Sequence, residues 1–178
     1  MSDVEILVEI GDLLAQDVDL IVNPANGSLN HAGGLARKIA EAAGPSLLDE
    51  CERLPLVPTG GAVATHAGEL NFMAVVHAVG PVWGGGQFCE AELLRGAHVS
   101  ACKVAGHFAS AYGRDVSIAF PAISCGIYGY PVKQAAPIAV ASLRGKHVDG
   151  IGVVKFVLFE DEHFEAYTKA LAAQRPRA

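Results

Sequence analysis

The sequence predicts one α/β domain whose largely parallel sheet is covered by helices on both faces. Apolar segments of strand length alternate along the chain with segments of helical periodicity. The inner strands are apolar throughout, which is typical of parallel strands buried on both faces. The chain has 178 residues, of which 51% are hydrophobic and 18% charged, and this is enough for one folded core.

Six strands and five helices are expected along the chain. The strands are expected at residues 4–10, 18–23, 62–67, 73–79, 116–121 and 152–159. The helices are expected at residues 35–43, 46–54, 89–112, 132–145 and 162–173. We expect the second strand to stop at Pro24, because proline has no N–H to donate to a central ladder. Residues 175–178 are expected to be frayed.

The charge and cysteine content exclude several classes of protein. A net charge of −6 with no basic stripe argues against bulk binding of nucleic acid or of an acidic membrane. It does not exclude a small anionic ligand, which backbone N–H groups can bind locally. The four cysteines are scattered and form no C-x-x-C pair, so a reducing compartment is favoured. No signal peptide or bilayer-spanning run is apparent, and we expect a cytoplasmic location.

The first segment that carries chemistry is the loop from Pro24 to Gly34, between the second strand and the first helix. Its glycines precede a helix N-terminus, where free N–H groups and the helix dipole favour an anion. Asn26 and His31 add neutral hydrogen-bonding groups beside that position. The alternative is that Gly33 and Gly34 only permit a tight turn between strand and helix.

A second glycine-rich loop runs from Ser124 to Tyr130, after the strand at 116–121. Its glycines allow the backbone to approach a ligand, and Tyr128 could pack on a ribose. The alternative is a plain loop whose tyrosines cover the core. Both loops follow strands, and ligands of such sheets bind at the carboxyl ends of the strands. We therefore expect the two loops to lie at one crevice.

Several other sites are disfavoured. No dinucleotide-binding G-x-G-x-x-G, no G-x-x-x-x-G-K-[ST] phosphate loop and no Gly-x-Ser-x-Gly elbow occurs. His66 and His77 lie inside predicted strands and are interpreted as core residues. His98 and His107 lack the spacing of a metal pair, so metal binding is disfavoured. No cofactor is expected. Cys125 has no basic neighbour and is interpreted as inert.

Taken together, these segments resemble the macrodomain family of ADP-ribose-binding modules. The matching segments are residues 11–13, 22–26, 32–35, 42–44, 76–81 and 121–131, in the family's order. The similarity covers residues 4–173 of a domain that we expect to span 1–178. The segments His-Ala-Gly-Gly-Leu-Ala and Ala-Ala-Gly-Pro-x-Leu look most like the first macrodomains of vertebrate macro-containing ADP-ribosyltransferases and like viral macrodomains.

The resemblance implies a three-layer α/β/α fold with a mixed central sheet and a site for ADP-ribose. Asp12 would hold the adenine amine beside the Leu13 backbone, although Asp12 could also simply cap a turn. Phe159 would pack on the adenine ring. The residues implied around the distal ribose and phosphates are Asn26, Gly33, Gly34, Leu35, Ser124, Cys125, Gly126, Ile127 and Tyr128.

Three positions depart from the family pattern. Pro24 replaces an alanine and should stiffen its loop, and Ala32 replaces the first of three glycines. Ala36 stands where hydrolases of the best-known type carry an aspartate, so turnover by a carboxylate at that position is excluded. Viral macrodomains also lack this aspartate, yet are regarded as hydrolases that use the equivalents of Asn26 and His31 with a phosphate-positioned water.

Three functions therefore stay open. The favoured one is hydrolysis of the ester between ADP-ribose and acidic side chains of mono-ADP-ribosylated proteins, with Asn26 and His31 as catalytic residues. The second is a non-catalytic reader of ADP-ribose or of ADP-ribosylated proteins. The third is an O-acetyl-ADP-ribose deacetylase, which uses the same pocket and the same ester chemistry.

Overall fold

The computed structural model describes residues 4–174, and the expected fraying of residues 175–178 lies outside them. The strands are β1 (Glu5–Ile10), β2 (Leu20–Ala25), β3 (Ala62–Thr65), β4 (Ala74–Val79), β5 (Val116–Phe120) and β6 (Ile151–Leu158). The helices are α1 (Gly34–Ala43), α2 (Pro45–Arg53), α3 (Glu90–Tyr112), α4 (Val132–Ala141) and α5 (Asp161–Gln174). The short 3-10 turns are η1 (Leu13–Ala15) and η2 (Lys146–Val148).

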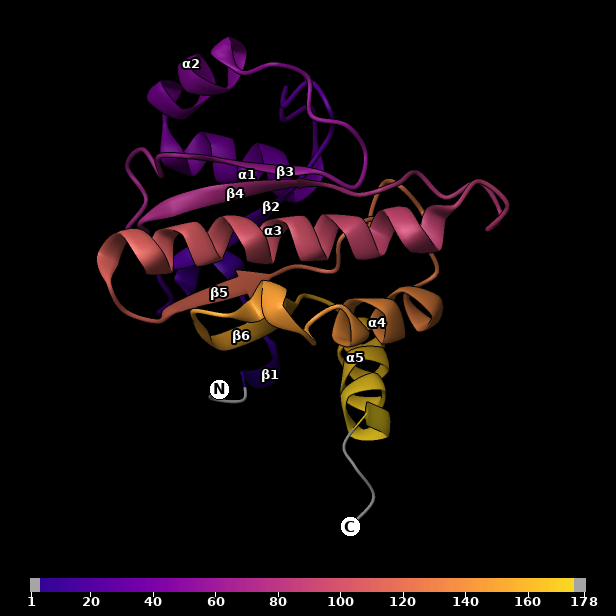
Figure 1. Cartoon of the computed structure of the whole chain (residues 1–178). Helices are drawn as coiled ribbons and strands as arrows, with labels where there is room; N and C mark the ends of the chain where they lie inside the picture. Colours follow the sequence, from indigo (N-terminus) through magenta and orange to yellow (C-terminus); the bar gives the residue numbers. More distant parts are fainter. Residues whose placement is uncertain (1–3, 175–178) are drawn as a thin grey trace.

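The six strands form one sheet in the order β1-β6-β5-β2-β4-β3. Strands β1, β6, β5, β2 and β4 run parallel to one another, and β3 pairs antiparallel with β4 at the edge. Helices cover both faces of the sheet (Figure 1). The predicted α/β fold with a mixed, largely parallel sheet is therefore confirmed.

Side chains alternate between the two faces of each inner strand, as strand geometry requires. In β2, Leu20 and Val22 pack into the core formed with α3, α4 and α5, whereas Ile21 packs against α1 and α2. In β4, Val76 joins the first core and Val75 the second. The inner strands thus bury apolar side chains on both faces, which explains their largely apolar sequences.

The turn between α1 and α2 follows from two adjacent residues. Gly44 has a φ of +82°, which favours glycine, and its N–H donates to the Ala40 carbonyl (3.1 Å). Pro45 occupies the start of α2, where a missing N–H costs no hydrogen bond. This turn lets α2 pack beside β3 and buries Cys51 in the core.

The prediction that β2 stops at Pro24 was wrong, because the strand continues to Ala25. The pairing of β2 with β5 ends at Ile21, whereas its pairing with β4 continues through Pro24, opposite Ala78. Beyond Ile21, therefore, β2 has a partner strand on one side only. Proline is tolerated there for the same reason that it is tolerated on an edge strand.

The fourth helix is shorter than predicted. The helix α4 ends at Ala141, where the Ser142 hydroxyl donates to the Ile138 carbonyl (2.7 Å), and Gly145 with a φ of +106° leads into η2. Among the described residues, no helix has both the length and the apolar composition that crossing a membrane would need.

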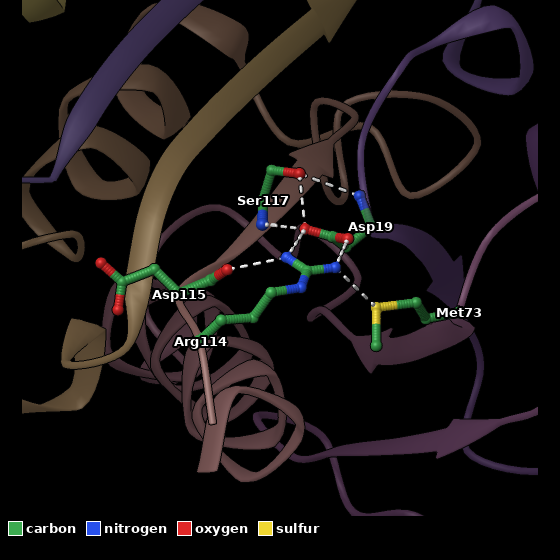
Figure 2. Close-up of polar contacts among 5 residues, drawn as sticks. All are labelled: Asp19, Met73, Arg114, Asp115 and Ser117. Atoms are coloured by element: carbon green, nitrogen blue, oxygen red, sulfur yellow. Dashed lines mark hydrogen bonds and ion pairs between the residues drawn. The ribbon is translucent and has the colours of Figure 1, made fainter. Parts of the chain in front are cut away.

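Asp19 ties together the amino-terminal ends of three neighbouring strands (Figure 2). Its Oδ2 accepts hydrogen bonds from the N–H and the hydroxyl of Ser117 in β5 (2.8 and 3.0 Å). Its backbone carbonyl accepts from the N–H of Met73, just before β4 (2.8 Å). The Arg114 guanidinium contacts both carboxylate oxygens, at 2.5 and 3.2 Å. The hydrogen bond from Arg114 is the main reason that the pKa of Asp19 lies below its usual range.

Replacing this carboxylate should reduce stability in a pH-dependent way. We expect Asp19→Asn to lower the free energy of unfolding at pH 7 by about 1–2 kcal/mol, since these hydrogen bonds involve a charged, partly exposed group. The folded pKa of Asp19 is lowered, so its contribution is present above the unfolded pKa of about 3.9 and is lost as the pH falls through the folded value. Urea unfolding at pH 7 and pH 3 measures both effects. The exposed Asp17→Asn is the control, and equal losses at pH 7 would contradict the prediction.

Candidate functional site

A cleft of about 850 Å³ opens at the carboxyl ends of the five parallel strands. In the order of the sheet, its lining residues include Asp12 after β1, Phe159 after β6, Ser124 after β5, Asn26 after β2 and Gly80 after β4. Because neighbouring strands lie ~4.8 Å apart, these four spacings extend the cleft over roughly 19 Å. The cleft is therefore elongated, and its two ends are formed by different strands.

The amino terminus of α1 contributes free N–H groups to the cleft. Gly33 caps this helix without a side-chain hydrogen bond, and the first turn contains no acidic residue. The N–H groups of residues 34–36 precede the first helical hydrogen bond, which runs from the Arg37 N–H to the Gly33 carbonyl (3.4 Å). These N–H groups and the helix dipole favour a bound anion.

A second set of free N–H groups lies in the loop after β5. Ser124 has a φ of +66°, which is rare for a residue with a side chain, and its carbonyl accepts from the Tyr130 N–H (2.9 Å). This hydrogen bond closes the loop. The N–H groups of Gly126, Ile127 and Tyr128 donate to no group of residues 4–174. Consecutive free N–H groups of this kind form a concave site for an anion.

The side chain of Ile127 extends from the loop after β5 to Gly33 and Gly34 at the start of α1, so the two sets of N–H groups are close to each other. A Cβ added at Gly33 would lie 3.4 Å from Ile127 Cδ1, and one added at Gly34 would lie 3.6 Å from the same atom. Ile127 is 81% exposed, so it lies over the cleft opening rather than in the core. An anion held beneath Ile127 would be contacted from both loops.

The conformation of the loop after β5 depends on Gly80. A Cβ at Gly80 would lie 2.2 Å from Ser124 Oγ and 2.5 Å from Ile123 Cγ2. The Ser124 hydroxyl is buried and has no hydrogen-bond partner within the described part of the chain. It also lines the cleft and is therefore available to a ligand.

Asp12 and Phe159 form one end of the cleft. Asp12 Oδ1 accepts a hydrogen bond from the Leu14 N–H (2.9 Å), so the capping role expected for Asp12 is confirmed. Its other carboxylate oxygen remains available. Phe159 is 83% exposed, with Lys38 Nζ 5.7 Å from the centre of its ring. An exposed aromatic face beside a carboxylate suits a flat ring that carries an amino group.

Asn26 lies at the opposite end, directly after β2. Its Oδ1 accepts hydrogen bonds from the Ser28 hydroxyl (3.1 Å) and the Asn30 N–H (3.3 Å), and its Nδ2 donates to Asn30 Oδ1 (2.6 Å). These bonds fix the orientation of the amide at the cleft. A fixed amide can both donate to and accept from the hydroxyls of a sugar.

His31 lines the same end, but its ring nitrogens belong to a buried network. Its Nε2 lies 3.2 Å from Asn23 Nδ2, which also lies 3.0 Å from His77 Nδ1. The Nδ1 of His31 is buried without a partner among the described residues. Burial lowers the pKa of His31, and it lowers the pKa of His77 to about 3. Both rings are therefore mainly neutral at pH 7.

The charged side chains of the cleft do not explain how it could bind an anion. Asp12 and Glu160 contribute negative charge, and Lys38 contributes positive charge. The free N–H groups of the two loops are thus the main positive features of the cleft.

The structure brings together the residues predicted for the site, except Cys125. The predicted residues that line the cleft are Asp12, Leu13, Asn26, His31, Gly33, Gly34, Leu35, Ser124, Gly126, Ile127, Tyr128 and Phe159. The Cys125 thiol instead donates to the Ile123 carbonyl (3.5 Å), and burial raises its pKa to about 12.

Asn23 and Gly80 are among the cleft residues that were not assigned to the site from the sequence. Asn23 lies within a largely apolar strand, and no spacing of neighbouring residues indicates that its side chain lines a cleft. Gly80 follows a similar strand. The sequence signal that could have indicated its role was a glycine directly after the end of that strand.

The comparisons with known proteins agree with this fold. The family model of the Macro domain matches residues 22–139, and the chain therefore belongs to the macrodomain family. It is 40% identical over 179 residues to a macro domain-containing protein of Listeria monocytogenes, covering 96% of this chain and 98% of that protein. It is 42% identical over 172 residues to an O-acetyl-ADP-ribose deacetylase of Klebsiella pneumoniae, covering 93% and 95%.

A solved structure extends this similarity to a ligand complex. A mutant of the Oceanobacillus iheyensis macrodomain with ADPR matches the fold with a TM-score of 0.84 and 31% sequence identity. The match covers 96% of this chain and 93% of that one.

A methyl group at position 80 should destabilise the protein. We expect Gly80→Ala to lower the free energy of unfolding by about 1–3 kcal/mol, because the added Cβ forces Ser124 and Ile123 out of their places. Urea unfolding measures this loss. Gly126→Ala is the matched control, since a Cβ at Gly126 would meet no atom within 4 Å. The prediction fails if the two variants are equally stable.

Proposed function

We propose that this protein binds ADP-ribose and hydrolyses the ester that links ADP-ribose to acidic side chains of mono-ADP-ribosylated proteins. The observation that carries the proposal is the pair of free N–H sets at the middle of an elongated cleft, with an aromatic end and an amide end. The four free cysteines favour the cytosol as the place where the protein acts.

The order of the strands predicts how ADP-ribose would lie. The adenine would stack on Phe159, with its amine donating to Asp12. The diphosphate would accept hydrogen bonds from the start of α1 and from the loop after β5. The distal ribose would lie between Asn26 and Tyr128. The complex of the Oceanobacillus macrodomain with ADPR supports a ligand of this class.

The hydrolysis would use a water held between the bound diphosphate and the loop after β2. Attack by this water consumes one water molecule and releases ADP-ribose and the free carboxyl group. Asn26 would orient the ribose, and His31 would position substrate or water through the shape of its neutral ring. Ala36 offers no carboxylate at the start of α1, so we expect modest rates from positioning and electrostatics alone.

Two other functions use the same cleft. The Klebsiella relative is named an O-acetyl-ADP-ribose deacetylase, which favours turnover of that small ester. A non-catalytic reader is favoured by the absence of a side-chain carboxylate at Ala36. Turnover assays with both esters separate these functions from the proposed one.

Binding can be tested without turnover. In calorimetry we expect ADP-ribose to bind more tightly than AMP or NAD. Phe159→Ala should weaken ADP-ribose binding by about 5- to 150-fold, since stacking of a base on an aromatic ring contributes ~1–3 kcal/mol. Phe88→Ala, which removes an exposed aromatic ring away from the cleft, should have no effect. Equal affinity for ADP-ribose and AMP would contradict the proposal.

Turnover is tested with a protein that carries mono-ADP-ribose on glutamate. We expect the label to be lost faster with enzyme than with buffer. Asn26→Ala should slow this loss by about 10- to 100-fold, because a small displacement of the substrate from its reactive orientation can lower the rate by this much. The exposed Asn71→Ala serves as control. If label loss matches buffer but O-acetyl-ADP-ribose is consumed, the protein is a deacetylase; if neither is consumed, it is a reader.

A further inference from the structure

Three side chains with metal-binding atoms meet beneath the amide end of the cleft. His31 comes from the loop after β2, Cys51 from α2 and His77 from β4, and all three are buried. Their ligand atoms lie within 4.8 Å of one another. Cys51 Sγ is 3.8 Å from His77 Nε2. Sulfur and nitrogen ligands of one tetrahedral zinc ion lie about 3.6 Å apart, so this pair is close to the separation that a shared ion needs.

The amide of Asn23 controls which histidine nitrogens are free. Its Nδ2 points at His31 Nε2 and His77 Nδ1, while its Oδ1 is buried without a partner among the described residues. Rotating the amide by half a turn places Oδ1 between the two rings, where it can accept an N–H from each. This rotation leaves a lone pair on the second nitrogen of each ring, which is Nδ1 in His31 and Nε2 in His77, and the latter faces Cys51 Sγ. Histidines that bind metals commonly donate their other N–H in this way.

Thr65 occupies the remaining side of His77. The Thr65 hydroxyl donates to the His66 carbonyl (3.0 Å) and lies 2.9 Å from His77 Nε2, so it accepts the N–H of that ring nitrogen. A bound ion would replace this proton, and Thr65 Oγ1 would then lie beside the ion as a possible fourth ligand. The cluster thus offers one sulfur, two nitrogens and a neighbouring oxygen.

We propose that His31, Cys51 and His77 form a buried binding site for a thiophilic divalent cation, with zinc as the ion favoured by this donor set. Binding deprotonates the Cys51 thiol and releases one proton per ion. The protons of His31 and His77 move to the nitrogens that face Asn23, with no further proton released. The ion would join the loop after β2 to α2 and β4.

The protonation states of the three groups agree with this site. Burial lowers the pKa of both histidines, which keeps them in the neutral form that binds metals. Burial also raises the pKa of the Cys51 thiol to about 11, with a further contribution from Glu50. Without an ion, Cys51 therefore remains a thiol at pH 7, and metal binding should be accompanied by measurable proton release.

The test is titration of the chelator-treated protein with Co²⁺, followed by Zn²⁺. We expect one Co²⁺ per chain with a thiolate-to-cobalt absorption band, and displacement of that band by one Zn²⁺. Cys51→Ser should abolish the band. Cys102→Ser, which alters a buried cysteine of α3, and Cys89→Ser, which alters an exposed one, should retain it. Absence of the band in the wild type, its survival in Cys51→Ser or its loss in Cys89→Ser would overturn the proposal.

A measurement on the unmodified protein covers the case in which Cys51→Ser fails to fold. X-ray absorption of the zinc-loaded wild type should show one sulfur ligand with imidazole nitrogens, and calorimetry in different buffers should show release of one proton per ion. A zinc shell of only oxygen and nitrogen, or one with two sulfurs, would overturn the proposal. Neither measurement uses ADP-ribose, so failure here is independent of the proposed hydrolase.

Discussion

Buried backbone N–H groups need hydrogen-bond acceptors. Two sets of N–H groups at the carboxyl ends of the parallel strands have no acceptor within the described part of the protein. The uncapped start of α1 and the loop after β5 expose these groups side by side. Neighbouring residues determine the loop conformation that exposes these N–H groups. Gly80 leaves room for Ser124, and Ser124 takes a left-handed conformation. The sheet order then determines which chemical groups flank the anion position.

The two ends of the parallel strands have different roles. At the amino-terminal ends of the strands, the Asp19 carboxylate binds Ser117 of β5 and Arg114, which follows α3, and its backbone carbonyl binds Met73 just before β4. At the carboxyl ends, the strands lead into loops in which two sets of N–H groups have no partner among residues 4–174. A sheet whose strands are held together at one end can keep the five loops at the other end in fixed relative positions. Weak individual contacts from these loops can then act together on one ligand.

Much of the fold could be predicted because strong local signals agreed with one another. Apolar runs, helical spacing and the Gly44–Pro45 junction located nearly every element. Pro24 misled the prediction, since proline is tolerated where a strand is paired on one side only, and the pairing of β2 with β5 ends at Ile21. The site was predictable where a loop contains its own glycines. The contact of Cys51 with His77 was not, because it joins residues from distant segments and no spacing along the chain indicates it.

The two most exposed apolar side chains of the cleft have a thermodynamic consequence. Phe159 and Ile127 are 83% and 81% exposed, although each lies where a ligand would cover it. Covering apolar surface removes ordered hydration water and lowers the heat capacity of the system. The enthalpy of ligand binding should therefore become steadily more favourable on warming, while the accompanying entropy becomes less so. Exposed hydrophobic side chains at the rim thus make the heat of binding, more than its free energy, sensitive to temperature.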